Sequence, residues 1–222
     1  MNAYFCTCLA AKFNPLPQKM LKVSILISFF SFLYESSLGQ SDCILRKDKD
    51  SVKVYVCKAK HTKFKLIKAE FTVNASVNQM IAMWLDAENY NNWQYNTTNA
   101  RLVKQLSENE IIYYTEVVAP WPMSNRDLVV HLKISQDEKT KALTVIGKSV
   151  ADYIPRKDEL VRIPLSISSW RVTPISESKQ TVEYSMELDP GGTVPAWMVN
   201  MVAAEAPYIT FKNFREKIKL KK

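Results

Sequence analysis

The chain has 222 residues, of which 47% are hydrophobic, and a formal net charge of +8. These values are typical of one sizeable globular domain with a hydrophobic core. The four glycines form no glycine-rich phosphate loop, which excludes the usual mononucleotide and dinucleotide sites. Because the basic residues are scattered, they indicate a solvated surface, with weak attraction to anionic membranes or polyanions as the alternative. We expect no nucleic-acid partner.

The N-terminal region has the pattern of a secretory signal peptide. Lys22 precedes an uncharged apolar run, Val23–Leu33, and the small residues Ser37 and Gly39 follow at a plausible cleavage point. The run is about half of the roughly 20 residues that span a bilayer, so a permanent membrane anchor is the poorer interpretation. We expect cleavage near Gly39.

This cleavage divides the chain into a leader with signal peptide, residues 1–39, and an exported domain, residues 40–222, that is periplasmic or extracellular. Within the leader, residues 1–19 have the pattern of neither a signal peptide nor a folded domain, so we interpret them as an unused upstream start or a disordered leader. The exported domain keeps Cys43 and Cys57 on two predicted strands of one hairpin. Because the compartment is oxidising, we expect a disulfide between them; the alternative is two buried free thiols.

One early helix and a series of strands follow in chain order. The sequence Ser76–Gln79 is typical of a capping box, and apolar residues at helical spacing follow it, so we expect a helix that ends near Asp86. After a polar loop, alternating segments between hairpin-sized turns predict antiparallel strands. With the cysteine hairpin, 44–46 and 52–56, the predicted strands are 100–106, 110–118, 127–136, 142–150, 167–175 and 181–188.

The connection 151–166 is long for a compact domain, and its apolar content favours packing over disorder. Beyond a turn at 189–192, Thr193 and Pro195 are typical of the N-cap and first residue of a helix. We expect that helix to run to about Lys219, with a kink at Pro207 and one face formed by Trp197, Met201, Ala204, Tyr208 and Phe211. The predicted fold is therefore α+β, with a twisted antiparallel sheet of six to eight strands and a long C-terminal helix.

Two short sequences carry a resemblance to a known family. They are Trp121–Asp127, which contains a Pro-Met-Ser-Asn-Arg-Asp run, and Asp189–Trp197 before the terminal helix. Both resemble the signatures of START domains, the steroidogenic-regulatory-protein-related lipid-transfer family, with motifs closest to its phosphatidylcholine transfer branch. The resemblance covers nearly all of residues 43–219. It implies a helix-grip fold, a curved sheet around the C-terminal helix with a lipid-sized tunnel, and it makes 151–166 the mobile loop beside the tunnel entrance.

The residues that define known ligands in this family are absent. Asn91 and Gln94 stand where phosphatidylcholine-binding members hold the phosphate, and Leu132 stands where the sterol-carrying branch has a buried arginine. The positions that match the aromatic choline cage, which holds its ligand by cation–π attraction, are Thr115, Leu128 and Ser166. The resemblance thus implies a lipid or other hydrophobic ligand without identifying it.

The expected function is non-catalytic binding or transfer of such a ligand, with no metal or cofactor and with transient membrane contact. Arg126 has two candidate roles: it pairs with Asp127 or another carboxylate to hold its loop, or it binds an anionic head group by bidentate hydrogen bonds. Apolar cavity walls and cores use the same residue types. The candidate lipid-binding residues are Tyr113, Thr115, Val117, Arg126, Leu128, Val130, Leu132, Ser166, Met201, Tyr208 and Phe211.

Two alternatives remain. Helix-grip relatives include aromatases and cyclases, and an enzyme of this type needs a cavity-facing acid or base, such as Glu116, Tyr113 or His131, with a shifted pKa. Catalysis has little other support, because His61 and His131 lack metal-ligand spacing and no nucleophile stands beside a base. The third possibility is an interaction domain with a filled core. The volume and polarity of the space under the terminal helix separate the three.

Overall fold

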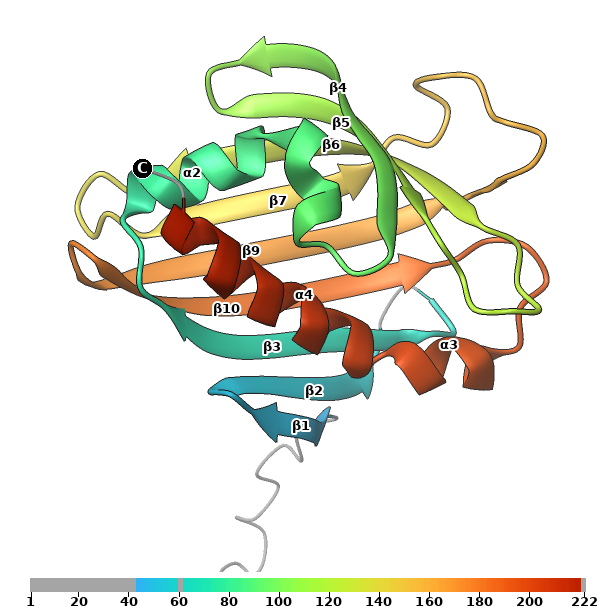
Figure 1. Ribbon diagram of the computed structural model, residues 1–222, viewed down its shortest axis with the longest axis horizontal. Coiled ribbons are helices and arrows are strands. Elements are labelled where there is room, and N and C mark those ends of the chain that lie inside the picture. The colour runs from blue at the N-terminus through green and yellow to red at the C-terminus, as the bar shows by residue number, and fades with distance from the viewer. Residues whose placement is uncertain (1–42, 60–61, 221–222) are drawn as a thin grey trace, which may run out of the picture. The chain divides into compact units, whose positions relative to one another are not determined.

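The structure is a computed structural model that describes residues 43–59 and 62–220 (Figure 1). The predicted signal peptide with its cleavage point, and His61, lie outside the described residues. Among the residues that are described, no helix is long and apolar enough to cross a membrane.

An antiparallel sheet forms the frame of the fold. In the described part of the chain, nine strands lie in the order β1-β2-β3-β10-β9-β7-β6-β5-β4, and the short β8 pairs in parallel with β6. Hairpin pairing of successive strands confirms the antiparallel prediction. The strands are β1 Cys43–Lys49, β2 Val52–Lys58, β3 Lys65–Val73, β4 Thr97–Ser107, β5 Glu110–Val117, β6 Arg126–Gln136, β7 Leu143–Ser149, β8 Val161–Arg162, β9 Leu165–Ser176 and β10 Lys179–Asp189.

The sequence interpretation missed β3, so its estimate of six to eight strands was too low. β3 lies between β2 and β10 and pairs with both. Its side chains alternate: Ile67, Ala69, Phe71 and Val73 are buried, and more exposed residues lie between them. This period of two is the signal of a strand with one buried face and was visible in the sequence.

The predicted capping box is present at the start of α2, Val77–Leu85. The Ser76 hydroxyl accepts a hydrogen bond from the Gln79 amide at 3.2 Å, and the Gln79 side chain accepts one from the Ser76 amide at 2.8 Å. These bonds satisfy amide groups that have no partner within the helix. The short 3₁₀ helix η1, Ala87–Asn92, occupies the segment predicted as a polar loop.

The terminal helix is divided, and its interruption lies earlier than the predicted kink. α3, Ala196–Val202, is separated from α4, Glu205–Lys217, by two residues, and the 3₁₀ helix η2, Ile218–Leu220, follows. Proline cannot donate to the carbonyl four residues before it, and its ring clashes with that group. For Pro207 that residue is Ala203, which is where the helix breaks.

The start of this helical region also differs from the prediction. Pro195 is the N-cap residue and makes no side-chain capping bond, so Thr193 is not the cap. Trp197 and Met201 are 63% and 68% exposed, whereas Tyr208 is buried. Because the break separates α3 from α4, the predicted single apolar face does not continue through both helices.

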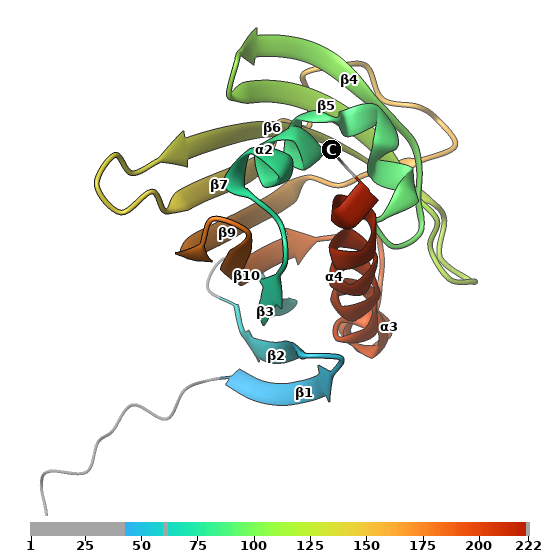
Figure 2. The ribbon, with the colours of Figure 1, turned by 60° about the vertical axis from the view of Figure 1, so that its left-hand side comes forward.

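α4 crosses one face of the sheet in both views (Figures 1 and 2). Its side chains meet an aromatic cluster from the sheet and α2. Phe211 stacks on Phe71 with ring centroids 4.8 Å apart and meets the edge of Trp170 at 5.3 Å. Phe214 contacts Trp84 and Trp170 at 5.9 and 5.7 Å. Such aromatic pairs contribute beyond their buried area and hold α4 against the sheet.

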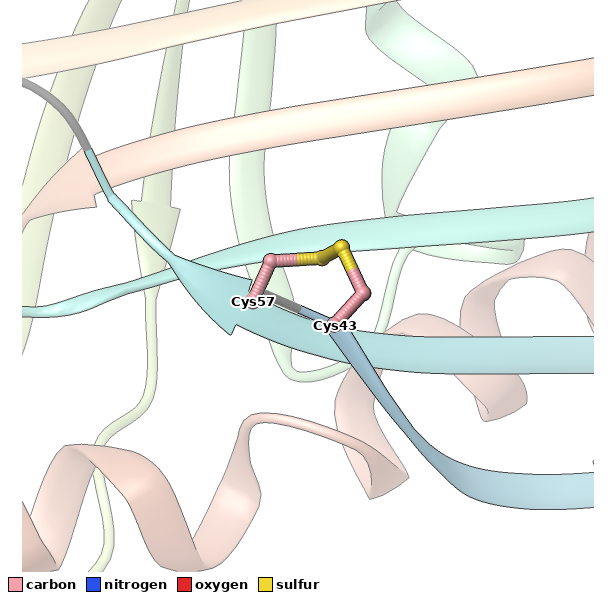
Figure 3. Close-up of a disulfide and its surroundings, with 2 residues drawn as sticks. All are labelled: Cys43 and Cys57. Carbon is pink, nitrogen blue, oxygen red and sulfur yellow. A yellow bond between two sulfur atoms is a disulfide. The ribbon is translucent and has the colours of Figure 1, made fainter. Parts of the chain in front are cut away.

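The β1–β2 hairpin holds the other side of α4. Tyr208 donates a hydrogen bond to the Asp50 carboxylate at 2.5 Å, and this bond lowers the pKa of Asp50. Arg215 donates to the Asp50 carbonyl, and Lys47 pairs with Glu205. The hairpin also contains the predicted Cys43–Cys57 disulfide, which joins directly paired residues of β1 and β2 (Figure 3).

The long connection packs against the outer face of the sheet, as its apolar content predicted. Ile154 lies against a buried cluster of Ile112, Tyr114 and Val129. Arg162 makes most of the hydrogen bonds that fix the connection. Its Nε and Nη2 donate to the two Asp127 carboxylate oxygens at 2.8 and 2.9 Å. Its remaining N–H groups donate to the carbonyls of Ala151, Ile154 and Pro155. All donors of this buried guanidinium are therefore used.

We expect Arg162→Leu to lower the free energy of unfolding by about 3–5 kcal/mol, because it leaves the Asp127 carboxylate buried without its partner. Arg156→Leu is the matched control, since Arg156 lies in the same connection and forms an exposed ion pair with Asp152. An exposed pair contributes about 0–1 kcal/mol. Urea unfolding measures both variants, and equal losses would contradict a central role for Arg162.

Candidate functional site

A cavity of about 370 Å³ lies between the sheet and the terminal helices in the described structure. Its walls include β3, β4, β5, β6, β9 and β10, and its cover comes from α3 and the first half of α4. The second half of α4 and the start of η2 pack without such a space, because Phe214 of α4 and Ile218 of η2 are fully buried in the core. The space under the terminal helix is therefore filled at one end and hollow at the other.

Strand alternation determines which side chains face the cavity. On β5 the inward residues are Tyr113, Thr115 and Val117, and they pair across the ladder with the inward residues of β6. Thr115 lies opposite Leu128, and Val117 lies opposite Arg126. Side chains at such paired positions are neighbours on the same face of the sheet.

Nine of the eleven candidate residues line the cavity, and two do not. Tyr208 is buried against the β1–β2 turn instead, and Met201 is exposed on the outer side of α3. The choline-cage positions all face the cavity without supplying an aromatic ring. The nine lining candidates are Tyr113, Thr115, Val117, Arg126, Leu128, Val130, Leu132, Ser166 and Phe211.

Several lining residues were not among the candidates. Ser168 and Trp170 follow Ser166 at intervals of two on β9, and Tyr184 and Met186 lie on the neighbouring β10. The same alternation that placed residues on β5 and β6 could have identified them. On α3, by contrast, Val199 and Val202 line the cavity, and predicting them required the position of the helix break, which lies at Ala203 and not at the predicted kink at Pro207.

Two tyrosines of the cavity wall, Tyr113 and Tyr184, carry neutral hydroxyl groups. Burial raises the pKa of Tyr113, and burial followed by the proximity of Tyr113 raises the pKa of Tyr184. Burial opposes the charged form of a phenol, so both hydroxyls stay protonated at neutral pH. They can donate hydrogen bonds to a ligand.

Arg126 lies inside the cavity wall and is 6% exposed. Its Nη1 donates to the carbonyl of Ser124 in the preceding loop. It does not pair with Asp127, one of the carboxylates considered for its loop-holding role, because Asp127 faces the opposite side of β6 and binds Arg162. Burial lowers the pKa of Arg126, as desolvation opposes a charged group.

Two of the three acid–base candidates face away from the cavity. Glu116 lies on the outer face of β5, where burial acts to raise its pKa but hydrogen bonds from Lys157, Asn99 and Tyr114 lower it overall. Glu116 therefore does not provide the cavity-facing acid with a raised pKa that the enzyme alternative needs. His131 lies 2.6 Å from Glu110, also on the outer face. Among the described residues, no cluster of three or more His, Cys, Asp or Glu could hold a metal ion.

The antiparallel sheet, the C-terminal helix across it and the cavity between them define a helix-grip protein, as predicted. Residues 41–218 match the START domain family. An uncharacterised protein of Pseudomonas aeruginosa is 30% identical over 198 residues, which are 88% of this chain and 96% of that protein. The chain belongs to the START domain family.

The chain is also similar to two proteins that are named for lipid transfer. The crystal structure of a STAR-related lipid transfer protein from Xanthomonas axonopodis has a TM-score of 0.74 at 30% identity, covering 80% of this chain and 99% of that one. Mouse phosphatidylcholine transfer protein is 27% identical over 106 residues, 46% of this chain and 49% of its own. Similarity to the phosphatidylcholine branch is thus distant, in agreement with the missing choline-cage residues.

Proposed function

We propose that the protein binds and carries a lipid or other hydrophobic molecule in the cavity without transforming it. The observation that carries this proposal is the hollow half of the interior, whose volume of about 370 Å³ falls within the usual range of ligand pockets. Apolar walls favour such a ligand by roughly 25 cal/mol per Å² of apolar surface buried, before the costs of ordering are subtracted. The family and the lipid-transfer relatives support the same function.

The polar groups of the cavity suit holding a ligand better than reacting with one. The hydroxyls of Tyr113 and Tyr184 stay protonated, and Arg126 remains charged at physiological pH because its pKa starts far above neutral. The carboxylate and imidazole that an aromatase-like or cyclase-like enzyme would use, on Glu116 and His131, lie on the other face of the sheet. These placements favour binding over catalysis.

Loading and release require an opening, and two neighbouring segments are suited to provide it. α3 and the β5–β6 loop lie at the same end of the molecule in both views (Figures 1 and 2). Both line the cavity, α3 with Val199 and the loop with Met123. Both also carry exposed aromatic side chains, Trp121 at 91% and Trp197 at 63%. Because indole rings favour the interface between water and lipid, we propose that this end contacts a membrane transiently.

The proposal includes export of the domain after cleavage near Gly39. The support is the signal-like sequence together with the Cys43–Cys57 disulfide, a bond that persists in oxidising compartments. A carrier in the periplasm or outside the cell would move its ligand between membranes or between a membrane and another protein.

We expect Leu128→Trp to reduce ligand binding by about ten-fold or more, because the larger side chain occupies the cavity. The free energy of unfolding without ligand should change by only about 1 kcal/mol, since the ring enters a hollow. The control is Lys133→Trp, which places the same ring on the exposed face of the same strand. Displacement of a fluorescent fatty-acyl probe and mass spectrometry of co-purified lipid measure binding. Equal lipid recovery from both variants would contradict the cavity as the binding site.

We expect Trp121→Ser together with Trp197→Ser to weaken binding to lipid vesicles by about ten-fold, because two indole rings no longer enter the interface. Ile175→Ser is the control. Ile175 is also exposed, but it lies near the C-terminal end of β9, away from the end of the molecule that carries the two tryptophans. Vesicle sedimentation measures both. The proposed contact is wrong if the control variant loses as much binding as the tryptophan variant.

We expect the protein recovered from an exporting host to begin near Gln40 and to contain no free thiol. Cleavage there removes Cys6 and Cys8, and the two remaining cysteines form the disulfide. Intact-mass spectrometry with and without a thiol-alkylating reagent measures both features. A chain that retains residues 1–39 in its folded, exported form would overturn the proposed processing.

A further inference from the structure

Arg126 is a buried cation for which the described structure supplies no counter-charge. It forms no ion pair with any described carboxylate, and its one hydrogen bond there is to the carbonyl of Ser124. The Nε and Nη2 groups of the guanidinium have no described acceptor. Burial disfavours a charge that has no partner, so an anion that enters the cavity would be stabilised beside Arg126.

Arg162 provides an internal comparison. It is similarly buried and lies on the adjacent strand, because β8 pairs directly with the start of β6. All of its N–H groups have acceptors, including both oxygens of Asp127. In Arg162, an arginine that stabilises the fold, every N–H group is thus paired within the protein. The unfilled donors of Arg126 point to a partner that is not part of the protein.

The charge of the cavity has one sign. Among the described residues that line it, Arg126 and Lys65 are basic, and none is acidic. Thr115 lies diagonally across the β5–β6 ladder from Arg126, and Thr97 lies beyond Val117 on β4, so both hydroxyl residues border the same part of the wall. Basic and hydroxyl groups together are suited to a carboxylate or a phosphate.

Away from Arg126 the wall becomes apolar. Leu128, Val130 and Leu132 follow it along the inner face of β6, towards the aromatic cluster around Trp170. The cavity thus has a cationic end and a hydrocarbon end. An amphiphile with an anionic head and an aliphatic chain matches both.

The volume limits the size of the chain. The cavity of about 370 Å³ is near the lower end of the usual range of ligand pockets, about 300–1,000 Å³. A cavity of this size favours a ligand with one aliphatic chain over one with two chains and a glycerol backbone. We propose that the ligand is a single-chain anionic amphiphile whose carboxylate or phosphate binds Arg126 inside the cavity.

This inference rests on the proposed function, since it names the chemical class of the ligand carried in the same cavity. Charge-assisted bidentate hydrogen bonds to the guanidinium would replace the water that the cation loses on burial. The hydrocarbon chain would then lie along the inner residues of β6. Head-group charge, rather than head-group shape, is the expected determinant of specificity.

The test compares probes that share one chain and differ in the head. Oleate carries a carboxylate, oleyl alcohol is neutral, and oleoyl lysophosphatidic acid carries a phosphate. We expect the wild-type protein to bind the anionic probes at least about ten-fold more tightly than the alcohol, as measured by titration calorimetry below the concentration at which each forms micelles. Dioleoyl phosphatidic acid tests the limit to one chain and should bind more weakly than its single-chain counterpart.

The variant Arg126→Met should remove the preference for anions while leaving oleyl alcohol binding within about three-fold of wild type. Its melting temperature without ligand should stay equal or rise, because an unpaired buried charge is replaced by an apolar side chain. A merely structural arginine would instead lower the melting temperature. The matched control, Arg171→Met, removes an exposed arginine from β9 and should change neither property.

The outcomes separate this inference from the function on which it rests. If oleate and oleyl alcohol bind equally to the wild type, the anion inference is wrong and the carrier function stands. If no probe binds, both are wrong. A loss of anion preference in Arg171→Met as large as in Arg126→Met would also overturn the role of Arg126. The wild-type comparison decides the question even if Arg126→Met does not fold, and the two anionic probes distinguish a carboxylate from a phosphate ligand.

Discussion

The ion pair between Asp127 and Arg162 connects the parts of the chain that shape the interior. It ties the long connection to the outer face of β6 and so supports β8, which pairs with the start of that strand. Gly191, in the second signature, lies so close to this connection that a Cβ atom there would be 2.9 Å from the Arg162 carbonyl. Its φ of +68° also favours glycine. The two signatures therefore meet at Arg162, although they lie far apart in the sequence.

The same pair determines what faces the cavity. Successive side chains of a strand point to opposite faces, so fixing Asp127 outward places Arg126 inward. A shift of one residue would exchange them and move Leu128 and Val130 out of the wall as well. The rest of the interior follows from this register, because β5 pairs with β6 along its whole length. An interaction on the outer face of the sheet thus specifies the lining of the cavity on the inner face.

Local sequence signals predicted most of the fold, because strands and caps depend on neighbouring residues. The capping box at Ser76 and the alternation in β5 and β6 are examples, and the missed β3 had an equally clear alternation. Long-range features were harder to predict. Arg162 is separated from Asp127 by 35 positions and lies in a connection with several other charges, so nothing local distinguishes it as buried. The helix-grip fold was predicted from the family resemblance. The exposure of Trp197 and Met201 could not be predicted without the position of the helix break before Pro207.

Residue types alone could not predict whether the interior contains a cavity. The structure shows why one half of the interior is filled and the other half is hollow. Where α4 packs tightly, large aromatic rings such as Phe214 and Trp84 face each other. Under α3 and the start of α4, the lining includes small residues such as Ala203 and Ala206 from the helical region and Ser168 from β9. Small side chains on both surfaces leave a space that the fold does not close, and the atoms around it lose dispersion contacts. A bound ligand would restore these contacts and stabilise the folded chain by mass action. The cavity that lowers the stability of the ligand-free protein therefore favours the ligand-bound form.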